Sequence, residues 1–267
     1  MNHADQQGAD QVVQQLKDEF RVDIRADWGA AEDGSWRSGD WLKDELEHLQ
    51  RTIGLLASAM GGGGKFIENL NGVTIQKADI GTHGGEALRH RVSLSKKRQL
   101  SPWTVVHELA HAWDANYGWN LSVALEKYTG GWTSYPLGVM RRVWFGADAR
   151  VFRAENAPGL RGRLPGCNAA GYFYANLPSG SDWNFNRKED FAESVAMYLG
   201  WDKGNELSDW AKTRIQLHTL ANGEPHPRFG TDNWADYRKY FYPENGDYSQ
   251  TLRWKFVDEL FKGKISI

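Results

Sequence analysis

The residues best suited to chemistry in this sequence are those of the segment His107-Glu108-Leu109-Ala110-His111. On a helix, residues four apart lie one turn apart on the same face, so His107 and His111 point in the same direction. Two imidazoles at that separation can ligate one tetrahedral Zn²⁺. Glu108 stands next to the first histidine, where its carboxylate can take the proton of a zinc-activated water as that water attacks a carbonyl. The spacing therefore predicts a catalytic metal site with Glu108 as general base.

A third protein ligand must come from elsewhere in the chain. In one common pattern a glycine and then a histidine follow the second histidine at intervals of three residues. Those positions hold Asp114 and Tyr117, which excludes that pattern, and the single cysteine excludes a cysteine-based metal cluster. A glutamate on a downstream helix remains. Glu189 and Glu193 are four residues apart, so one can bind the metal while the other accepts the N–H of a ligand histidine.

Together, the segments His107–Asp114 and Glu189–Glu193 resemble the gluzincin metallopeptidases, in particular the group that includes the anthrax lethal factor catalytic domain and small bacterial relatives. The resemblance extends over roughly residues 70–200, with its motifs on two helices. It implies an α+β, zincin-like fold. In such a fold a small twisted sheet packs on the helix that carries the motif, and a mostly helical C-terminal half follows.

The resemblance also assigns roles to individual residues. It gives one Zn²⁺ ion three ligands, namely His107, His111 and Glu189. Glu193 becomes the carboxylate behind the ligands, and Asp114 matches an aspartate that such proteins often carry after the motif. The implied activity is hydrolysis of peptide bonds with Glu108 as general base. We expect endopeptidase action by default, because nothing in the sequence marks a pocket for a free terminus. A peptide or protein is then the substrate.

The residue that stabilises the oxyanion is left open by the sequence. Members of the family often have a tyrosine shortly before the third ligand, whereas Trp183 is the nearest aromatic residue here. The candidates for the donor are Tyr135, Tyr172, Tyr174, His218 and His226. His90 is a further candidate for approaching substrate, because the alternating segment 88–94 predicts a strand just before the motif helix.

The remaining periodicities predict the elements that position these residues. The motif helix should run from an N-cap at Ser101, with Pro102 in its first turn, to about Tyr117. A second helix should begin at Asn186. Elsewhere we expect helices over 10–20, 42–56, 208–220, 234–242 and 249–261, and strands over 22–26 and 73–76. Ser38 or Asp40 should cap the helix over 42–56, and the run of glycines at 61–64 reads as a flexible connector.

These elements suggest three consecutive regions within one compact unit. Residues 1–60 form an acidic segment that packs on the core, residues 61–205 form the catalytic core, and residues 206–267 form a helical extension. The catalytic core contains an insertion, rich in arginine and aromatic residues, over 118–185. Thirteen tryptophans are unusually many for this length, and we expect Trp103 and Trp113 to pack in the core around the motif helix.

Composition limits the other classes of function. With 32 Lys and Arg against 34 Asp and Glu, the net charge of −2 makes nucleic acid an improbable partner, although the arginines of the insertion leave that hypothesis open. Neither a membrane-spanning run nor a signal peptide is visible, so we expect a cytoplasmic protein, or a secreted one in its mature form. The main alternative to a peptidase is a zincin-like module that binds carbohydrate, cell wall or a protein partner without catalysis. Oligomeric state cannot be read from the sequence.

Overall fold

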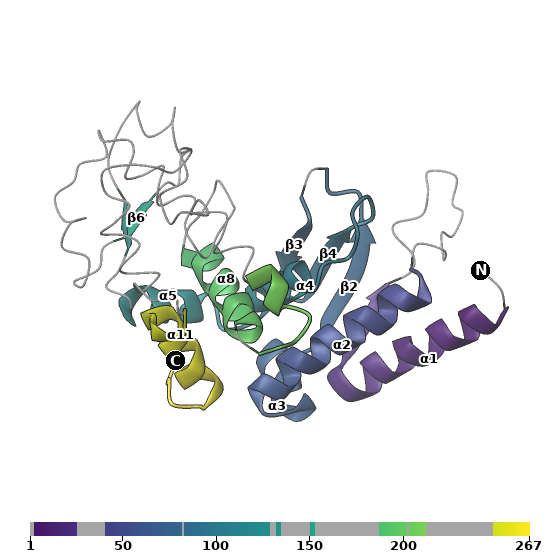
Figure 1. Cartoon of the computed structure of the whole chain (residues 1–267), viewed down its shortest axis with the longest axis horizontal. Coiled ribbons are helices and arrows are strands. Elements are labelled where there is room, and N and C mark those ends of the chain that lie inside the picture. The colour runs from purple at the N-terminus through teal and green to yellow at the C-terminus, as the bar shows by residue number, and fades with distance from the viewer. Residues whose placement is uncertain are drawn as a thin grey trace. The chain divides into compact units, whose positions relative to one another are not determined.

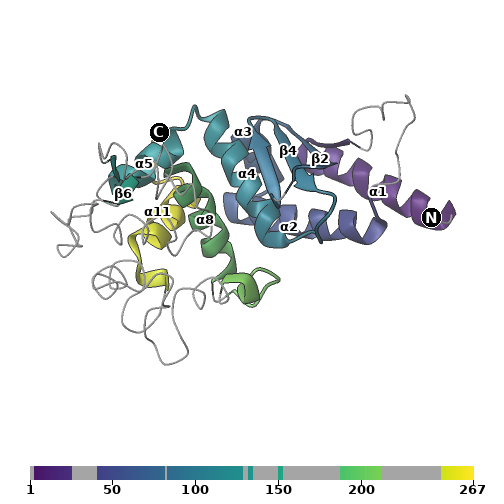
Figure 2. The same cartoon turned by 90° about the horizontal axis from the view of Figure 1, so that it is seen from above.

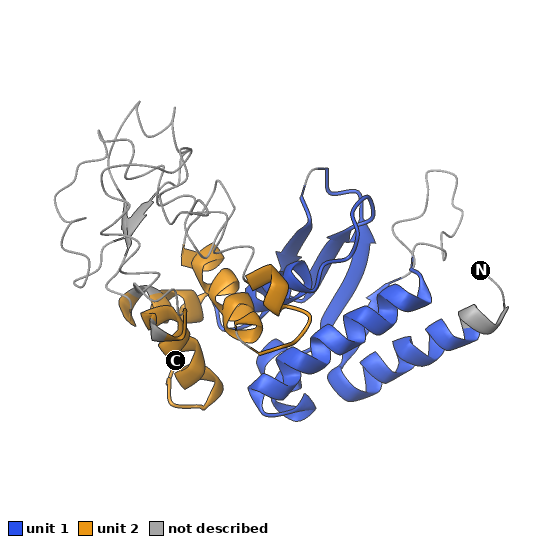
Figure 3. Ribbon diagram, viewed as in Figure 1, with its two compact units in different colours: residues 1–118 blue, residues 119–267 orange. Residues whose placement is uncertain are grey.

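The structure is a computed structural model of the whole chain, and it describes residues 3–25, 41–81, 83–128, 132–134, 150–152, 187–201, 203–211 and 248–267. The chain divides into two compact units, residues 1–118 and residues 119–267 (Figure 3). The boundary falls inside the region predicted as the catalytic core. Helices and a small sheet occur together, so the mixed helix and strand content expected from the sequence is confirmed.

The first unit is built around a four-stranded sheet with the strand order β1-β2-β4-β3 (Figure 1). These strands are β1 (Val22–Arg25), β2 (Val73–Ala78), β3 (Gly85–Leu88) and β4 (Arg91–Ser95). β1, β2 and β4 are parallel, and β3 is antiparallel to β4. Every second residue of β2 is buried, from Val73 onward, which is the pattern of a strand with one face on a core. The predicted strands over 22–26 and 73–76 are confirmed.

The segment over 88–94 is not the single strand that its alternation suggested. β3 ends at Leu88, Arg89 and His90 form a turn, and β4 begins at Arg91. Hairpin turns usually place glycine or asparagine where the backbone dihedral φ must be positive. Here Arg89 adopts a φ of 44° instead, so the sequence lacks the usual signal for a turn at this point.

Three helices, α1 (His3–Phe20), α2 (Lys43–Met60) and α3 (Gly63–Leu70), supply most of the remaining core of the first unit. α1 packs on α2, and α2 packs on α3. The helix α3 falsifies the interpretation of the glycine run as a connector, because Gly63 and Gly64 form its first turn. A Cβ atom at Gly63 would lie 2.7 Å from the backbone oxygen of Glu19, so close approach of α1 explains this glycine.

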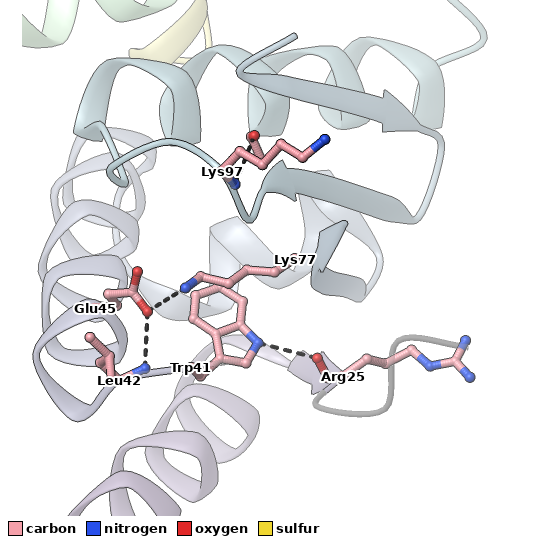
Figure 4. A network of polar contacts seen from close by, with 7 residues as sticks. Arg25, Trp41, Leu42, Glu45, Lys77 and Lys97 are labelled. Atoms are coloured by element: carbon pink, nitrogen blue, oxygen red, sulfur yellow. Dashed lines mark hydrogen bonds and ion pairs between the residues drawn. The ribbon is translucent and has the colours of Figure 1, made fainter. Parts of the chain in front are cut away.

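A polar network fixes the start of α2 on the sheet (Figure 4). The Leu42 backbone N–H donates to Glu45 Oε2 at 2.9 Å, and the ammonium group of Lys77 on β2 donates to the same oxygen. The Lys77 ammonium also lies 5.2 Å from the centroid of the Trp41 ring, whose Nε1–H donates to the Arg25 carbonyl. Glu45 thus serves the helix terminus directly, whereas the predicted caps at 38 and 40 lie outside the described residues.

The second unit contains a group of packed helices. α8 (Arg187–Gly200) contacts both α5 (Asn120–Tyr128) and α11 (Leu252–Phe261), and Figure 2 shows α8 beside α11. A short 3₁₀ turn, η3 (Tyr248–Gln250), precedes α11, whose N-cap Thr251 accepts a hydrogen bond from the Trp254 N–H at 3.1 Å.

Further along this unit, the described segments include a two-stranded antiparallel pair, β5 (Trp132–Ser134) and β6 (Arg150–Phe152). The helix predicted over 249–261 is confirmed from Leu252 onward. Of the helix predicted over 208–220, residues 208–211 are helical and the rest lies outside the described residues, as does the helix predicted over 234–242. Within the described part of the chain, no helix combines the length and the apolar character needed to cross a membrane.

Candidate metal centre

The motif lies on α4 (Pro102–Asn116), a helix with clear start and stop signals. Ser101 is the N-cap, and its hydroxyl accepts a hydrogen bond from the Thr104 N–H at 3.4 Å. The helix ends before Gly118, which has a φ of 64°. Both predicted ends are confirmed. Trp103 and Trp113 are buried, as predicted for residues that pack around this helix.

α4 is anchored at both ends within the first unit. It packs on β3 and β4, and it also contacts α2 and α3. At its C-terminal end the Asn116 side-chain amide donates to the Asn69 carbonyl at 2.8 Å, and the Tyr117 hydroxyl donates to Asn69 Oδ1 at 3.0 Å. These contacts fix the rotation of the helix, and with it the direction in which the motif side chains point.

His107 and His111 bring their ring nitrogens together. The two Nε2 atoms are 3.0 Å apart, and the rings meet nearly edge-on at an interplanar angle of 84°. A tetrahedral zinc ion with Zn–N bonds of 2.0–2.1 Å needs its two nitrogen ligands about 3.3 Å apart. The spacing of this pair therefore fits a shared ion closely. His111 is buried and His107 is partly exposed, so the pair lies at the edge of the core.

Glu108 lies against the neighbouring strand β3. Its side chain is buried, with 6% exposed, and it faces the backbone of Gly85. A Cβ atom at Gly85 would lie 2.5 Å from Glu108 Cγ and 2.7 Å from Glu108 Oε1. Gly85 is the first residue of β3.

Asp114 is fully buried on the same helix. It follows His107 by seven residues and His111 by three, so all three share one face of α4. A buried carboxyl group therefore lies on the face that carries the two imidazoles. This position is consistent with a bracing role for Asp114.

In the second unit, α8 carries the two downstream glutamates. Glu189 is partly exposed in the first turn, whereas Glu193, one turn later, is buried. Their spacing of four residues puts both on one face. Asn186, the predicted N-cap, lies outside the described residues.

α8 is held in the second unit by buried residues that the sequence analysis did not identify. Asp190 is fully buried and forms an ion pair with Arg253 of α11. Tyr248 is also fully buried beside this helix, and burial raises the pKa of its hydroxyl. Because Asp190 and Arg253 are 63 positions apart, no local sequence pattern links them.

Of the residues that the structure describes, His107, His111 and Glu189 offer the imidazole and carboxylate groups that could hold a metal ion. The histidines belong to the first unit and Glu189 to the second. Imidazole and carboxylate are ligands for zinc and also for other transition metals, so the donor set alone does not identify the ion.

Of the residues predicted to contact substrate or the oxyanion, the structure describes only His90. His90 lies in the turn between β3 and β4 and is exposed, so its placement on a strand face was wrong. The candidates for the oxyanion donor, Tyr135, Tyr172, Tyr174, His218 and His226, lie outside the described residues, as does Trp183.

Comparisons with protein-family models, with curated proteins and with solved structures find no match for this chain.

Proposed function

We propose that this protein is a zinc peptidase of the zincin type, with His107, His111 and Glu189 as metal ligands and Glu108 as general base. The observation that carries the proposal is the Nε2–Nε2 distance of 3.0 Å in the histidine pair, next to a buried glutamate. The two imidazole nitrogens converge from one face of α4, as a shared metal ion requires. The packing of α4 on β3 and β4 also supports a zincin-like catalytic core.

Glu189 completes the ligand set in this proposal, and Glu193 orients a ligand histidine by accepting its second N–H. Two observations support this division of roles. Glu189 is the more exposed of the two and Glu193 is buried, as expected for a carboxylate that stands behind a ligand. The buried pair of Asp190 and Arg253 fixes α8 at the residue next to Glu189.

The chemistry proposed for the site divides between the metal and Glu108. When bound, Zn²⁺ polarises a scissile carbonyl and lowers the pKa of a water molecule. Glu108 accepts the proton of the attacking water at a carboxylate oxygen and then delivers that proton to the leaving amine. Burial of the Glu108 carboxylate against β3 limits the directions in which it can point. In this proposal, that restriction keeps the carboxylate within hydrogen-bonding distance of the attacking water. We propose endopeptidase action, as expected from the sequence.

Zinc content and cleavage of a mixed peptide library, measured together on wild type and Glu108→Gln, test the proposal. Wild type should contain one zinc ion per chain and cleave peptides. Glu108→Gln should keep the zinc and lose cleavage, because the amide cannot accept the proton. Glu86→Gln, an exposed glutamate on β3, is a matched control that should retain both properties.

Two results would contradict the proposal in different ways. If wild-type protein purified without chelator contains no zinc or other transition metal, the proposed metal centre is wrong. Wild type that holds zinc but cleaves no peptide in the library leaves a metal-binding module without peptidase activity.

A further inference from the structure

The backbone conformation at residue 85 does not explain why this residue is a glycine. Gly85 is not among the described residues with positive φ, and it is paired with Leu94 in the antiparallel ladder between β3 and β4. Glycine inside a strand weakens it, because it offers no side chain to pack and loses more conformational entropy on folding. A strand glycine with ordinary dihedrals therefore points to a close approach by another group.

The group that approaches is the side chain of Glu108. The position that a Cβ would take at Gly85 is 2.5 Å from Glu108 Cγ, 2.7 Å from Oε1 and 2.9 Å from Cδ. All three contacts are with one side chain. The side chain that a Cβ at residue 85 would meet first is therefore that of Glu108.

We propose that Gly85 is a positioning residue for Glu108, an inference that deepens the proposed peptidase function and rests on it. The backbone of β3 forms a flat wall that the glutamate side chain lies against. This wall is fixed, because β3 is held by β4 and contacted by α4. The side chain lies along this wall from Cγ to Oε1, which limits the rotamers open to it, so the carboxylate keeps one direction relative to the histidines on the same helix. A misplacement of about 1 Å at a catalytic group can cost about 100-fold in rate.

The neighbouring Gly84 provides an internal comparison. A Cβ there would meet the Thr104 side chain at 3.5 Å, which is ordinary van der Waals contact. Both glycines face α4. Gly84 faces Thr104 and Gly85 faces Glu108, and these two α4 residues are one helical turn apart. Alanine should therefore fit at 84 and conflict at 85, and the pair separates contact with Glu108 from a general effect of changing this strand.

Thermal unfolding of the full chain tests the contact without any need for activity. Gly85→Ala should lower Tm by several degrees in the wild-type background and by the same amount in Glu108→Gln, since the amide has the same size. In Glu108→Ala, where the conflicting atoms are gone, Gly85→Ala should leave Tm unchanged or raise it. Gly84→Ala should leave Tm near the parent value in every background. An equal fall in Tm for Gly85→Ala in all three backgrounds would overturn the inference.

Peptide cleavage then tests whether the contact matters for the position of the carboxylate. Gly85→Ala should keep its zinc and its KM and lose about 100-fold in kcat, whereas Gly84→Ala should keep all three. A purely structural role would lower the amount of folded enzyme and leave the kcat of the folded fraction intact. Gly85→Ala with wild-type kcat overturns the positioning role. Wild type without cleavage instead overturns the proposed function, and the comparison of Tm values then decides by itself whether Gly85 constrains Glu108.

Discussion

Asp190 of α8 and Arg253 of α11 form a fully buried ion pair, with Arg253 Nη2 2.8 Å from Asp190 Oδ2 and the Nε–H donating to the second carboxylate oxygen. Both side chains are excluded from water, with 0% and 1% exposed. The bidentate geometry fixes the two helices in rotation as well as in distance. Because Glu189 is the residue next to Asp190, this pair positions the proposed third ligand within the second unit.

Breaking this pair should be costly. Arg253→Met keeps most of the side-chain volume but leaves the Asp190 carboxylate buried without its partner. We expect the free energy of unfolding to fall by about 3–5 kcal/mol, measured by urea denaturation. Lys17→Met, which removes the exposed pair of Lys17 and Asp23, is the control and should cost less than about 1 kcal/mol. Equal losses in the two variants would mean that the buried pair does not hold α8.

The two glutamates of α8 should respond differently to removal. Glu189→Ala takes away a proposed ligand, so the protein should lose its zinc on dialysis. Glu193→Ala takes away only the carboxylate that orients a ligand histidine, so zinc affinity should fall by about 10–100-fold. Competition with a chromophoric chelator measures both affinities. Retention of zinc by Glu189→Ala together with its loss in Glu193→Ala would reverse the two roles.

Asp258 should contribute stability that disappears in acid. Burial opposes its ionisation, but hydrogen bonds from Lys262 Nζ at 2.7 Å and from the Tyr198 hydroxyl at 2.9 Å outweigh burial and lower its pKa. A carboxyl whose pKa is lower in the folded state stabilises the fold above its unfolded pKa of about 3.9. That contribution is lost as pH falls through the lower folded value.

Asp258→Asn should therefore weaken the dependence of stability on pH below about pH 4, measured by urea unfolding at several pH values. Tyr198→Phe removes one of the two hydrogen bonds and should give an intermediate slope. Identical slopes for wild type and Asp258→Asn would contradict the pKa direction. The same contact acts on Tyr198, whose pKa rises to about 12 through burial and its hydrogen bond to Asp258.

Glu45 combines two tasks that substitutions can separate. Glu45→Gln keeps an oxygen for the Leu42 N–H but loses the charge that faces Lys77. Glu45→Ala loses both, and the lost acceptor at the helix terminus alone should cost about 1 kcal/mol. We expect the free energy of unfolding to fall in the order wild type, Glu45→Gln, Glu45→Ala. If the glutamine variant is as unstable as the alanine variant, the ion pair and not the cap carries the effect.

Local signals predicted the helices well where capping residues were explicit. Ser101 and Pro102 begin α4 as expected, and Gly118 follows its end. The same reasoning failed where a residue had a nonlocal reason to be there. Gly63 opens a helix because of the Glu19 backbone, and Arg89 forms a turn without the residue types that usually mark one.

The candidate site shows the same limit. The convergence of His107 and His111 follows from helical spacing alone, so the sequence was sufficient to predict it. The contact of Glu108 with Gly85 depends on which strand lies beside α4, and strand order is set by long-range pairing. The zincin-like fold and the peptidase activity depend on the types and spacing of the motif residues, and they stay predictions.

The hairpin formed by β3 and β4 has a mechanical consequence. Only Arg89 and His90 connect the two strands, so β3 cannot slide along the sheet unless β4 slides with it. β4 in turn is paired with β2 over five residue pairs. Lengthening the turn by inserted glycines would remove this restraint while leaving every residue of α4 in place. The direction of the Glu108 carboxylate would then depend on the length of the turn that follows Leu88, at the opposite end of β3 from Gly85.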